Sequence, residues 1–250
     1  MEPIISLHNI TKVFKDEPHR PLTVIKDISM EINKGEFFIF LGPSGSGKST
    51  LLRIMSGLEK EYEGKVVIDP SISKEDISFV FQQFALLPWL TVYENIRLGL
   101  VAKKMSEKER HIKIMAELER FGLHTFKDSH IHELSGGMRQ RVGIARAFVR
   151  NPKIIFMDEP FSELDSFIAE ELREQLLTIW KNSDTTIIMV SHNIEEALKL
   201  SDRIAILSTL PGTLKKVLTN ALPRPRQVRV PEFFAKEDEI YALIKPEIKE

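Results

Sequence analysis

One eight-residue segment constrains the fold of this chain more than any other: Gly42-Pro43-Ser44-Gly45-Ser46-Gly47-Lys48-Ser49. It has a glycine, four further residues and then Gly-Lys-Ser, which is the pattern of a P-loop. Residues 36–41 before it are apolar without alternation, which predicts a strand covered on both faces. Residues 49–55 after it predict a helix that ends near Gly57. Because a P-loop needs this strand–loop–helix context, whereas a chance glycine-rich turn does not, we expect a phosphate-binding loop.

The residue types in this loop have direct roles in phosphate binding. Glycines let backbone N–H groups face the phosphates, and the helix N-terminus adds a partial positive charge. Lys48 is expected to reach the terminal phosphates, and the Ser49 hydroxyl is expected to bind Mg²⁺. The nucleotide-binding residues predicted here are Gly42, Pro43, Ser44, Gly45, Ser46, Gly47, Lys48, Ser49 and Thr50.

A second buried-strand pattern, residues 154–157, ends in the acidic pair Asp158 and Glu159. Neighbouring side chains of an extended chain point in opposite directions, so the two carboxylates are expected to have different roles. We assign Asp158 to Mg²⁺, directly or through water, and Glu159 to activation of the attacking water as general base. The alternative is an acidic turn after a buried strand.

The remaining pattern predicts an α/β fold with a mainly parallel core sheet. Residues 5–10 and 24–32 alternate as antiparallel strands do, and residues 186–190 predict a further buried strand. Helices are expected to separate and follow the later strands. Residues of about 84–150 are mainly helical in pattern, so we expect one domain with a helical insertion rather than two independent domains.

Composition excludes several classes of protein. The 250 residues include no cysteine, which rules out disulfides, thiolate metal sites and a cysteine nucleophile. With 35 Lys+Arg against 36 Asp+Glu, there is no overall charge that favours nucleic acid. The longest apolar run is five residues, against the roughly 20 that a membrane helix needs. Since no signal-peptide pattern is present either, we expect an intracellular, globular protein.

The segment Leu134-Ser135-Gly136-Gly137-Met138-Arg139-Gln140 forms a second glycine loop before a predicted helix. Ser135 is suited to cap that helix, and the two glycines would let a phosphate approach its N-terminus. The residues themselves leave open whether both glycine loops bind one nucleotide. A capped helix after a flexible turn is the simpler interpretation of this segment taken alone.

With this segment, the chain resembles the nucleotide-binding subunit of an ATP-binding cassette (ABC) transporter over nearly its whole length. The segment at residues 134–140 resembles the signature motif of that family, residues 42–49 its P-loop and residues 154–159 its acidic strand. The resemblance implies an ABC cassette fold with an N-terminal antiparallel β-subdomain, over residues 4–235, followed by a tail at 236–250. It also implies a head-to-tail homodimer that binds two ATP molecules. The signature residues assigned to ATP on the other subunit are Ser135, Gly136, Gly137 and Gln140.

The resemblance assigns roles to four more residues. Gln82 matches the glutamine that senses Mg²⁺ and the attacking water and reports to the membrane partner. His192 matches the switch histidine that contacts the γ-phosphate, and Phe14 the aromatic residue that stacks on adenine. Asp165 matches the loop that links the two sites of the dimer. Three residues depart from the family pattern without removing a group that the chemistry needs: Phe14 for tyrosine, Glu163 for alanine and Asn193 for aspartate.

Three less specific segments resemble the nitrate, sulfonate and taurine importer branch: Leu87-Pro88-Trp89, Pro211-Gly212 and Leu222-Pro223-Arg224-Pro225-Arg226. The resemblance implies ATP hydrolysis at the cytoplasmic face of the membrane, coupled to permease subunits and indirectly to a periplasmic or extracellular solute-binding protein. The apolar residues 86–96 are the expected permease contact, although the core of the insertion is an alternative. An exporter cassette or a non-transport ABC ATPase remains the competing function. For Arg224, Arg226 and Arg229 we expect a solvated, proline-stiffened tail rather than a site for anionic lipid or nucleic acid.

Overall fold

In the computed structural model, which describes residues 2–15 and 21–245, the chain forms two compact units. Unit 1 comprises residues 1–70 and 186–250, and unit 2 comprises residues 71–185.

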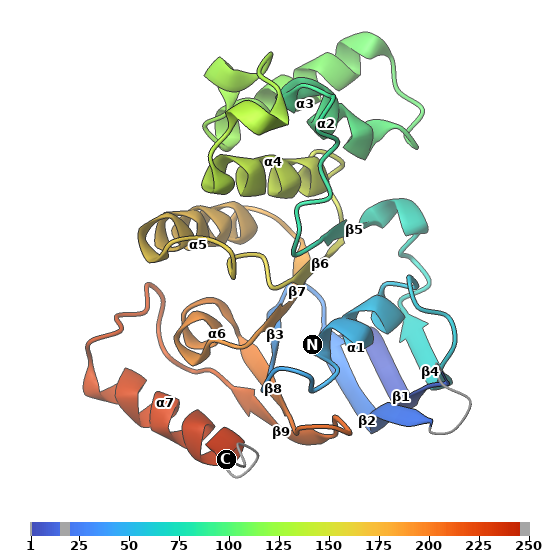
Figure 1. Ribbon diagram of the computed structural model, residues 1–250, viewed down its shortest axis with the longest axis vertical. Helices are drawn as coiled ribbons and strands as arrows, with labels where there is room; N and C mark the ends of the chain where they lie inside the picture. The colour runs from blue at the N-terminus through green and yellow to red at the C-terminus, as the bar shows by residue number, and fades with distance from the viewer. Residues whose placement is uncertain (1, 16–20, 246–250) are drawn as a thin grey trace. The chain divides into compact units, whose positions relative to one another are not determined.

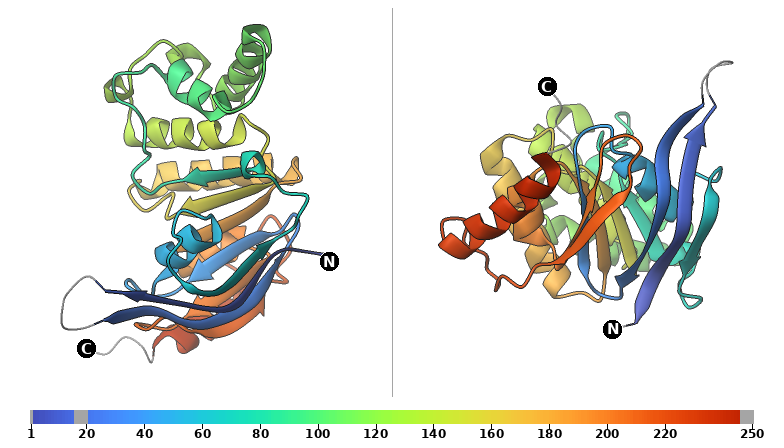
Figure 2. Two further views of the ribbon diagram at one scale, coloured as in Figure 1. Left: turned by 90° about the vertical axis from the view of Figure 1, so that its right-hand side faces the viewer. Right: turned by 90° about the horizontal axis from the view of Figure 1, so that it is seen from below.

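The N-terminal part of unit 1 is a three-stranded antiparallel sheet in the order β2-β1-β4. Its strands are β1 (Pro3–Phe14), β2 (Leu22–Asn33) and β4 (Glu63–Ile68). Ile5 of β1 pairs with Ile32 on one side and with Ile68 on the other. Figure 2 shows β1 and β2 as two long strands that run side by side. The predicted antiparallel N-terminal subdomain is confirmed.

The second sheet region of unit 1 is mainly parallel. Strand β3 (Phe37–Leu41) lies between β7 (Thr186–Ser191) and β8 (Arg203–Leu207) and is parallel to both. Every residue of β3 and β7 is buried, as the apolar runs without alternation predict. The edge strand β9 (Leu214–Thr219) is antiparallel to β8.

Three helices accompany these strands in the described part of unit 1. They are α1 (Lys48–Met55), α6 (Ile194–Leu200) and α7 (Pro231–Ile244). Helix α7 packs beside α6, as Figure 1 shows. The boundary expected between residues 235 and 236 falls inside α7. Pro231 occupies the first turn of α7, where its missing N–H costs no hydrogen bond.

Unit 2 pairs two parallel strands, β5 (Ile77–Val80) and β6 (Ile154–Asp158), and is otherwise helical. Its α-helices are α2 (Val92–Arg97), α3 (Glu107–Arg120), α4 (Gly136–Phe148) and α5 (Ser166–Lys181). Short 3₁₀ helices lie at Lys74–Asp76, Leu98–Leu100, His124–Phe126 and Ile131–Glu133. Because β5, β6 and α5 also belong to it, unit 2 extends beyond the expected helical insertion at residues 84–150.

The two units together confirm an α/β fold with mainly parallel strand pairing and a separate antiparallel sheet. Within residues 2–15 and 21–245, no helix is long and apolar enough to cross a membrane.

Candidate functional site

The P-loop of unit 1 connects the end of β3 to the first turn of α1. Gly47 occupies the cap position of α1 with φ 79°, a left-handed conformation that glycine adopts without strain. Because Gly47 has no side chain, the N-terminus of α1 carries no side-chain cap. The caps of α2, α3 and α4, by contrast, are the hydroxyl side chains of Thr91, Ser106 and Ser135. A helix N-terminus left open in this way, beside a glycine-rich loop, is suited to bind an anion.

The side chain of Lys48 forms hydrogen bonds with the backbone of the P-loop. It is buried, and Nζ donates hydrogen bonds to the carbonyl oxygens of Gly42 and Pro43, both at 2.8 Å. Nζ also lies 3.3 Å from the hydroxyl of Ser46. The ammonium group is therefore held within the loop, where the negative charge of a phosphate would lie.

Glycine is required at Gly42 and Gly47 by close packing. A Cβ atom at Gly42 would lie 2.9 Å from the backbone oxygen of Leu207, and one at Gly47 would lie 3.0 Å from that of Val24. Both contacts are tighter than a Cβ atom normally makes. The loop is thus packed tightly against β2 and β8, and this fixes the directions of its backbone N–H groups.

Gly212 packs against the backbone of the P-loop at Ser46, a contact that was not predicted from the sequence. Its N–H donates to the carbonyl oxygen of Val24 at 2.8 Å, and its own carbonyl accepts from the N–H of Lys26 at 3.0 Å. A Cβ atom at Gly212 would lie only 2.1 Å from the carbonyl oxygen of Ser46. The sequence linked Pro211-Gly212 only to the nitrate, sulfonate and taurine importer branch, because nothing in a single sequence shows this long-range contact.

His192 is exposed and follows β7 directly, at the entry to α6. Asn193 caps α6: its Oδ1 accepts a hydrogen bond from the N–H of Glu196 at 3.0 Å. The Ser191 hydroxyl donates to the carboxylate of Glu196 and accepts from the N–H of Asn193. Since asparagine caps helices as well as aspartate does, the departure at Asn193 preserves the local structure around His192.

The C-terminal end of α6 is held by Arg224 and Arg226, so the expectation that these two arginines are solvated was wrong. Arg226 Nη1 donates to the carbonyl oxygens of Leu198, Lys199 and Ser201 at 2.8, 3.1 and 2.6 Å. Arg224 donates to the carbonyl oxygen of Leu200. The last carbonyls of a helix lack intrahelical partners, so a half-buried guanidinium is well suited to this position.

Burial, and next the proximity of Arg224, lowers the pKa of Arg226 to about 10. The Arg226 guanidinium is therefore charged at neutral pH. Arg224 also forms an ion pair with Asp202. Of the three arginines, only Arg229 has the exposed position expected of a solvated tail.

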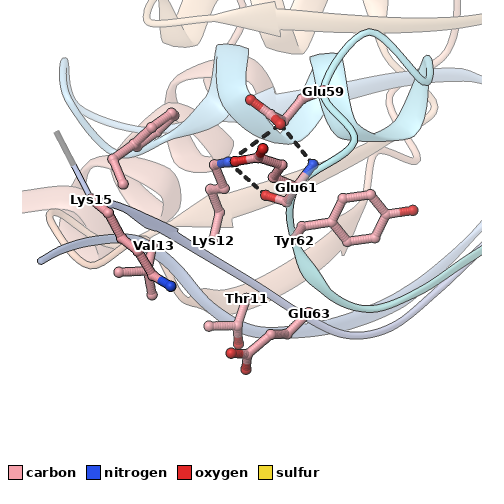
Figure 3. A pocket seen from close by; sticks show the side chains of 9 residues that line it. Thr11, Lys12, Val13, Lys15, Glu59, Glu61, Tyr62 and Glu63 are labelled. Carbon is pink, nitrogen blue, oxygen red and sulfur yellow. Dashed lines mark hydrogen bonds and ion pairs between the residues drawn. The ribbon is translucent and has the colours of Figure 1, made fainter.

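Phe14, at the end of β1, lines an open cleft of about 690 Å³. Figure 3 shows other side chains that line this cleft, among them Lys12 and Tyr62. The Nζ atom of Lys12 lies 4.6 Å from the centroid of the Phe14 ring. Lys12 is itself buried, paired with Glu59 at 3.3 Å and hydrogen-bonded to the carbonyl oxygen of Glu61. The Phe14 ring is thus held on one side by a fixed cation and remains part of an open cleft, as a stacking residue for adenine requires.

In unit 2, Asp158 is the last residue of β6 and Glu159 is the first residue after it, and the two differ in burial. Asp158 is 3% exposed at the end of β6, whereas Glu159 is half-buried. Glu159 has φ 45°, a left-handed backbone conformation that is strained for a side chain of this size. Its carbonyl oxygen accepts from the hydroxyl of Ser162 at 3.0 Å. Strained backbone of this kind is characteristic of functional sites.

The signature segment forms the N-terminus of α4. The Ser135 hydroxyl accepts a hydrogen bond from the N–H of Met138 at 3.3 Å, as expected for a cap. A Cβ atom at Gly137 would lie 2.3 Å from Cγ2 of Ile168, so this glycine allows α5 to approach closely. Ser135 is exposed and Gly136 is half-buried.

Gln140 has a different environment from the other signature residues. Its side chain is fully buried, and neither amide atom has a hydrogen-bond partner among the described residues. A direct contact with ATP on another subunit needs an accessible side chain. Gln140 is thus an interior residue of the signature helix in this structure, and its assignment to ATP on another subunit stays a prediction.

Two further predicted site residues lie in loops of unit 2. Asp165 caps α5, with Oδ1 accepting from the N–H groups of Phe167 and Ile168 at 3.1 and 3.0 Å. Gln82 is exposed just after β5. Trp89, in the loop that follows, is 69% exposed, whereas Val92 and Ile96 of α2 are fully buried, so the alternative of an insertion core fits only the second half of residues 86–96.

The residues assigned to Mg²⁺ each have a suitable oxygen. Ser49 of unit 1 has a hydroxyl and Asp158 of unit 2 has a carboxylate, and Mg²⁺ prefers such oxygen ligands, binding few protein groups and keeping several waters. Within the described residues, no cluster of three or more His, Cys, Asp or Glu side chains competes as a metal site. Lys48, His192 and Phe14 belong to unit 1, whereas Gln82, Glu159 and the signature belong to unit 2.

Comparisons with known proteins agree with this set of motifs. A family model described as ABC transporter matches residues 25–162. The aliphatic sulfonates import ATP-binding protein SsuB of Bacillus cereus is 44% identical over 225 residues, which cover 89% of this chain and 88% of the relative. The nitrate import ATP-binding protein NrtD of Synechocystis is 40% identical over 236 residues, covering 90% and 89%. A dimeric, post-hydrolysis structure of the ATP-binding cassette MJ0796 with ADP and Pi has a TM-score of 0.76 at 35% identity, covering 86% of this chain and 98% of that one.

Proposed function

This chain belongs to the ABC transporter family, and from that premise we propose that it drives the import of a small oxyanion or sulfonate by binding and hydrolysing MgATP. It is an ATP-binding cassette, and an ATPase activity coupled to transport follows from its family. The importer relatives and the dimeric cassette support a homodimer joined to membrane permease subunits. The detailed roles that follow are proposals.

The single observation that carries the proposal is the geometry of the P-loop. A buried ammonium group, a left-handed glycine and an open helix N-terminus lie together in residues 42–49. Lys48 and the backbone N–H groups are proposed to bind the phosphates of ATP, and Phe14 to stack on its adenine. His192, on the rigidly capped turn before α6, is proposed to contact the γ-phosphate and to stabilise charge there.

Mg²⁺ would be held by Ser49 and Asp158, with Gln82 as a further oxygen donor. When bound, the ion would neutralise phosphate charge. Glu159 is proposed to accept the proton of the attacking water at a carboxylate oxygen. Its partial burial and strained backbone support this role, since both fix the position of the carboxylate.

We propose that the signature residues Ser135, Gly136 and Gly137 bind ATP held by the P-loop of a second copy of the chain, and that Asp165 links the two sites. The exposed Ser135 hydroxyl and the N-terminus of α4 support this role, because they offer donors to an anion. A monomer would then hydrolyse ATP poorly, because each site needs the signature of the partner subunit.

The nucleotide site is tested by substituting Lys48. Lys48→Ala removes the buried ammonium group and is expected to lower the affinity for ATP at least tenfold in titration calorimetry. Lys65→Ala, on the exposed surface of β4, is the matched control and should bind ATP as the unaltered chain does. Unchanged ATP affinity in Lys48→Ala would contradict the proposed phosphate-binding role.

The permease contact is proposed to lie at residues 86–96, next to Gln82, on the cytoplasmic face of the membrane. The strongest support is Trp89, because a large aromatic side chain that is 69% exposed is suited to bury itself in a partner. Leu87→Glu with Trp89→Glu should abolish co-purification with the permease encoded beside this gene and leave ATP affinity unchanged. Retained co-purification would refute this surface.

The transported solute is proposed from the names of the relatives, which import sulfonates and nitrate. A solute-binding protein encoded beside this gene should bind nitrate, taurine or an alkanesulfonate in calorimetry. If no such protein is encoded there, an exporter or a non-transport ABC ATPase becomes the better interpretation.

A further inference from the structure

The segment after Gln82 has an unusual backbone conformation. Phe84 and Ala85 are consecutive residues with φ 32° and 45°. Positive φ is unfavourable for residues other than glycine, and two in a row persist only where the surroundings hold them. The contacts that hold this pair are therefore informative.

Arg146 of α4 holds both residues through their carbonyl oxygens. Its Nη1 donates to the carbonyl oxygen of Ala85 at 2.6 Å, and its Nη2 donates to that of Phe84 at 2.8 Å. The planar fork of a guanidinium matches two adjacent acceptors, which lysine cannot do. Burial lowers the pKa of Arg146, yet a guanidinium remains charged at neutral pH.

A second side chain fixes the rest of the segment. Asn95 of α2 is fully buried, and its Oδ1 accepts from the N–H of Leu87 at 2.9 Å. Its Nδ2 donates to the carbonyl oxygens of Leu87, Leu90 and Thr91 at 3.1, 3.3 and 2.9 Å. The loop that presents Trp89 is therefore held to α2, while its first half is held to α4.

Helix α2 and the residues just after it pack closely against α4. Gly99, just after α2, lies so close to α4 that a Cβ atom there would be 2.4 Å from the carbonyl oxygen of Arg146. Helix α4 then runs back to Gly136, the start of the signature loop. At 1.5 Å per residue, Arg146 lies about 15 Å along the helix from that start.

We propose that Arg146 is a positioning residue that links the loop at residues 82–91 to the signature loop through α4. If a permease displaced this loop at Trp89, the hydrogen bonds to Arg146 would transmit the displacement to α4. Ser135 and the two signature glycines, at the start of α4, would then shift with the helix. The reverse also holds, so closure of the signature on ATP would move the loop. This inference rests on the proposed function, which assigns the permease contact and the signature roles.

The alternative is that Arg146 only stabilises the loop, with no effect on the signature. Hydrogen exchange of the free chain separates the two, because it reports on both loops without ATP. Arg146→Gln should increase exchange at least fivefold in residues 84–91 and also in residues 136–139. Arg97→Gln is the matched control, because Arg97 is an exposed arginine paired with Glu107 on the surface of unit 2.

Faster exchange in residues 84–91 alone would overturn the link. Arg146→Lys keeps the positive charge but lacks the planar, two-pronged guanidinium. It should raise exchange in the same two segments by a smaller factor, and it also serves as the test if Arg146→Gln does not fold.

A second readout is ATP turnover, where Arg146→Gln should lower kcat about tenfold with KM for ATP within twofold. If Arg146 acts through the signature loop, the double variant Arg146→Gln, Ser135→Ala should lower kcat no more than the more severe of the two single variants. A kcat lowered by the product of the two single effects would contradict the proposal.

Failure of the proposed function would look different. A parent chain that neither binds nor hydrolyses ATP would refute that function, while the exchange pattern of Arg146→Gln would still report whether the two loops are linked. A parent chain that hydrolyses ATP, with an Arg146→Gln variant equal to it in both readouts, would refute the link alone.

Discussion

Gly212 and Ser46 are in such close contact that a Cβ atom at residue 212 would lie 2.1 Å from the carbonyl oxygen of Ser46. The P-loop is thus fixed on its far side by the turn between β8 and β9 as well as by Lys48. A nucleotide-binding loop that is held before its ligand arrives loses little conformational freedom on binding.

Gly212→Ala should displace the P-loop at Ser46, because the added methyl group has no room to move away from a backbone atom. We expect at least a tenfold loss of ATP affinity in titration calorimetry, with near-normal helical content by circular dichroism. Gly143→Ala is the control, since a Cβ atom at Gly143 would lie an ordinary 3.7 Å from its nearest neighbour, the carbonyl oxygen of Phe84. ATP affinity unchanged in Gly212→Ala would show that this turn does not set the P-loop.

Arg226→Gln should destabilise unit 1, because it leaves the last carbonyls of α6 without their charged donor. Hydrogen bonds to charged groups contribute about 1.5–3 kcal/mol, so we expect a loss of about 2–3 kcal/mol in the free energy of unfolding. Urea denaturation measures it. Arg229→Gln, at an exposed position three residues later, should change stability by less than about 0.5 kcal/mol. Equal effects of the two substitutions would contradict the capping role.

Acid should weaken the helices of unit 2 through two capping-box carboxylates. Hydrogen bonds from Thr91 lower the pKa of Glu94, and hydrogen bonds from Ser106 lower that of Glu109. Because the folded pKa lies below the unfolded value of about 4.3, this stabilisation is complete above that pH. It is lost as pH falls through the lower, folded values.

The free energy of unfolding, measured by urea titration from pH 6 to 3, should therefore fall less steeply in the double variant Glu94→Gln, Glu109→Gln than in the unaltered chain. Glutamine preserves the capping geometry but does not titrate. Glu119→Gln, at an exposed position near the end of α3, is the control and should leave the slope unchanged. Identical pH slopes in all three proteins would refute the assignment.

Local patterns predicted the elements that carry chemistry. The apolar runs before Gly42 and Asp158 are buried strands, and a helix follows the P-loop at Lys48–Met55, close to the predicted residues 49–55. These predictions succeeded because strand burial and helix periodicity are local properties of the sequence. The full burial of Gln140 was not evident from the sequence, since burial of a polar side chain depends on packing from distant segments.

Residues 222–226 also show that contacts between distant segments could not be predicted from local sequence patterns. Alternating prolines and arginines indicated a solvated segment, yet Arg224 and Arg226 bind carbonyl oxygens of α6. Their acceptors lie more than twenty residues earlier in the chain, and no local pattern encodes that pairing. For the same reason, the sequence did not reveal the support of the P-loop by Gly212 or the bond from Arg146 to the loop after Gln82.

The central claim is that Glu159 activates water in a dimer closed by ATP. Glu159→Gln tests it most directly, because the amide keeps the shape of the side chain but cannot accept a proton. With Glu163→Gln as a control in the same exposed turn, Glu159→Gln should lower ATP turnover at least 100-fold and bind ATP normally. It should elute as a dimer in ATP and as a monomer without it. Turnover by Glu159→Gln at the rate of the unaltered chain would contradict the account.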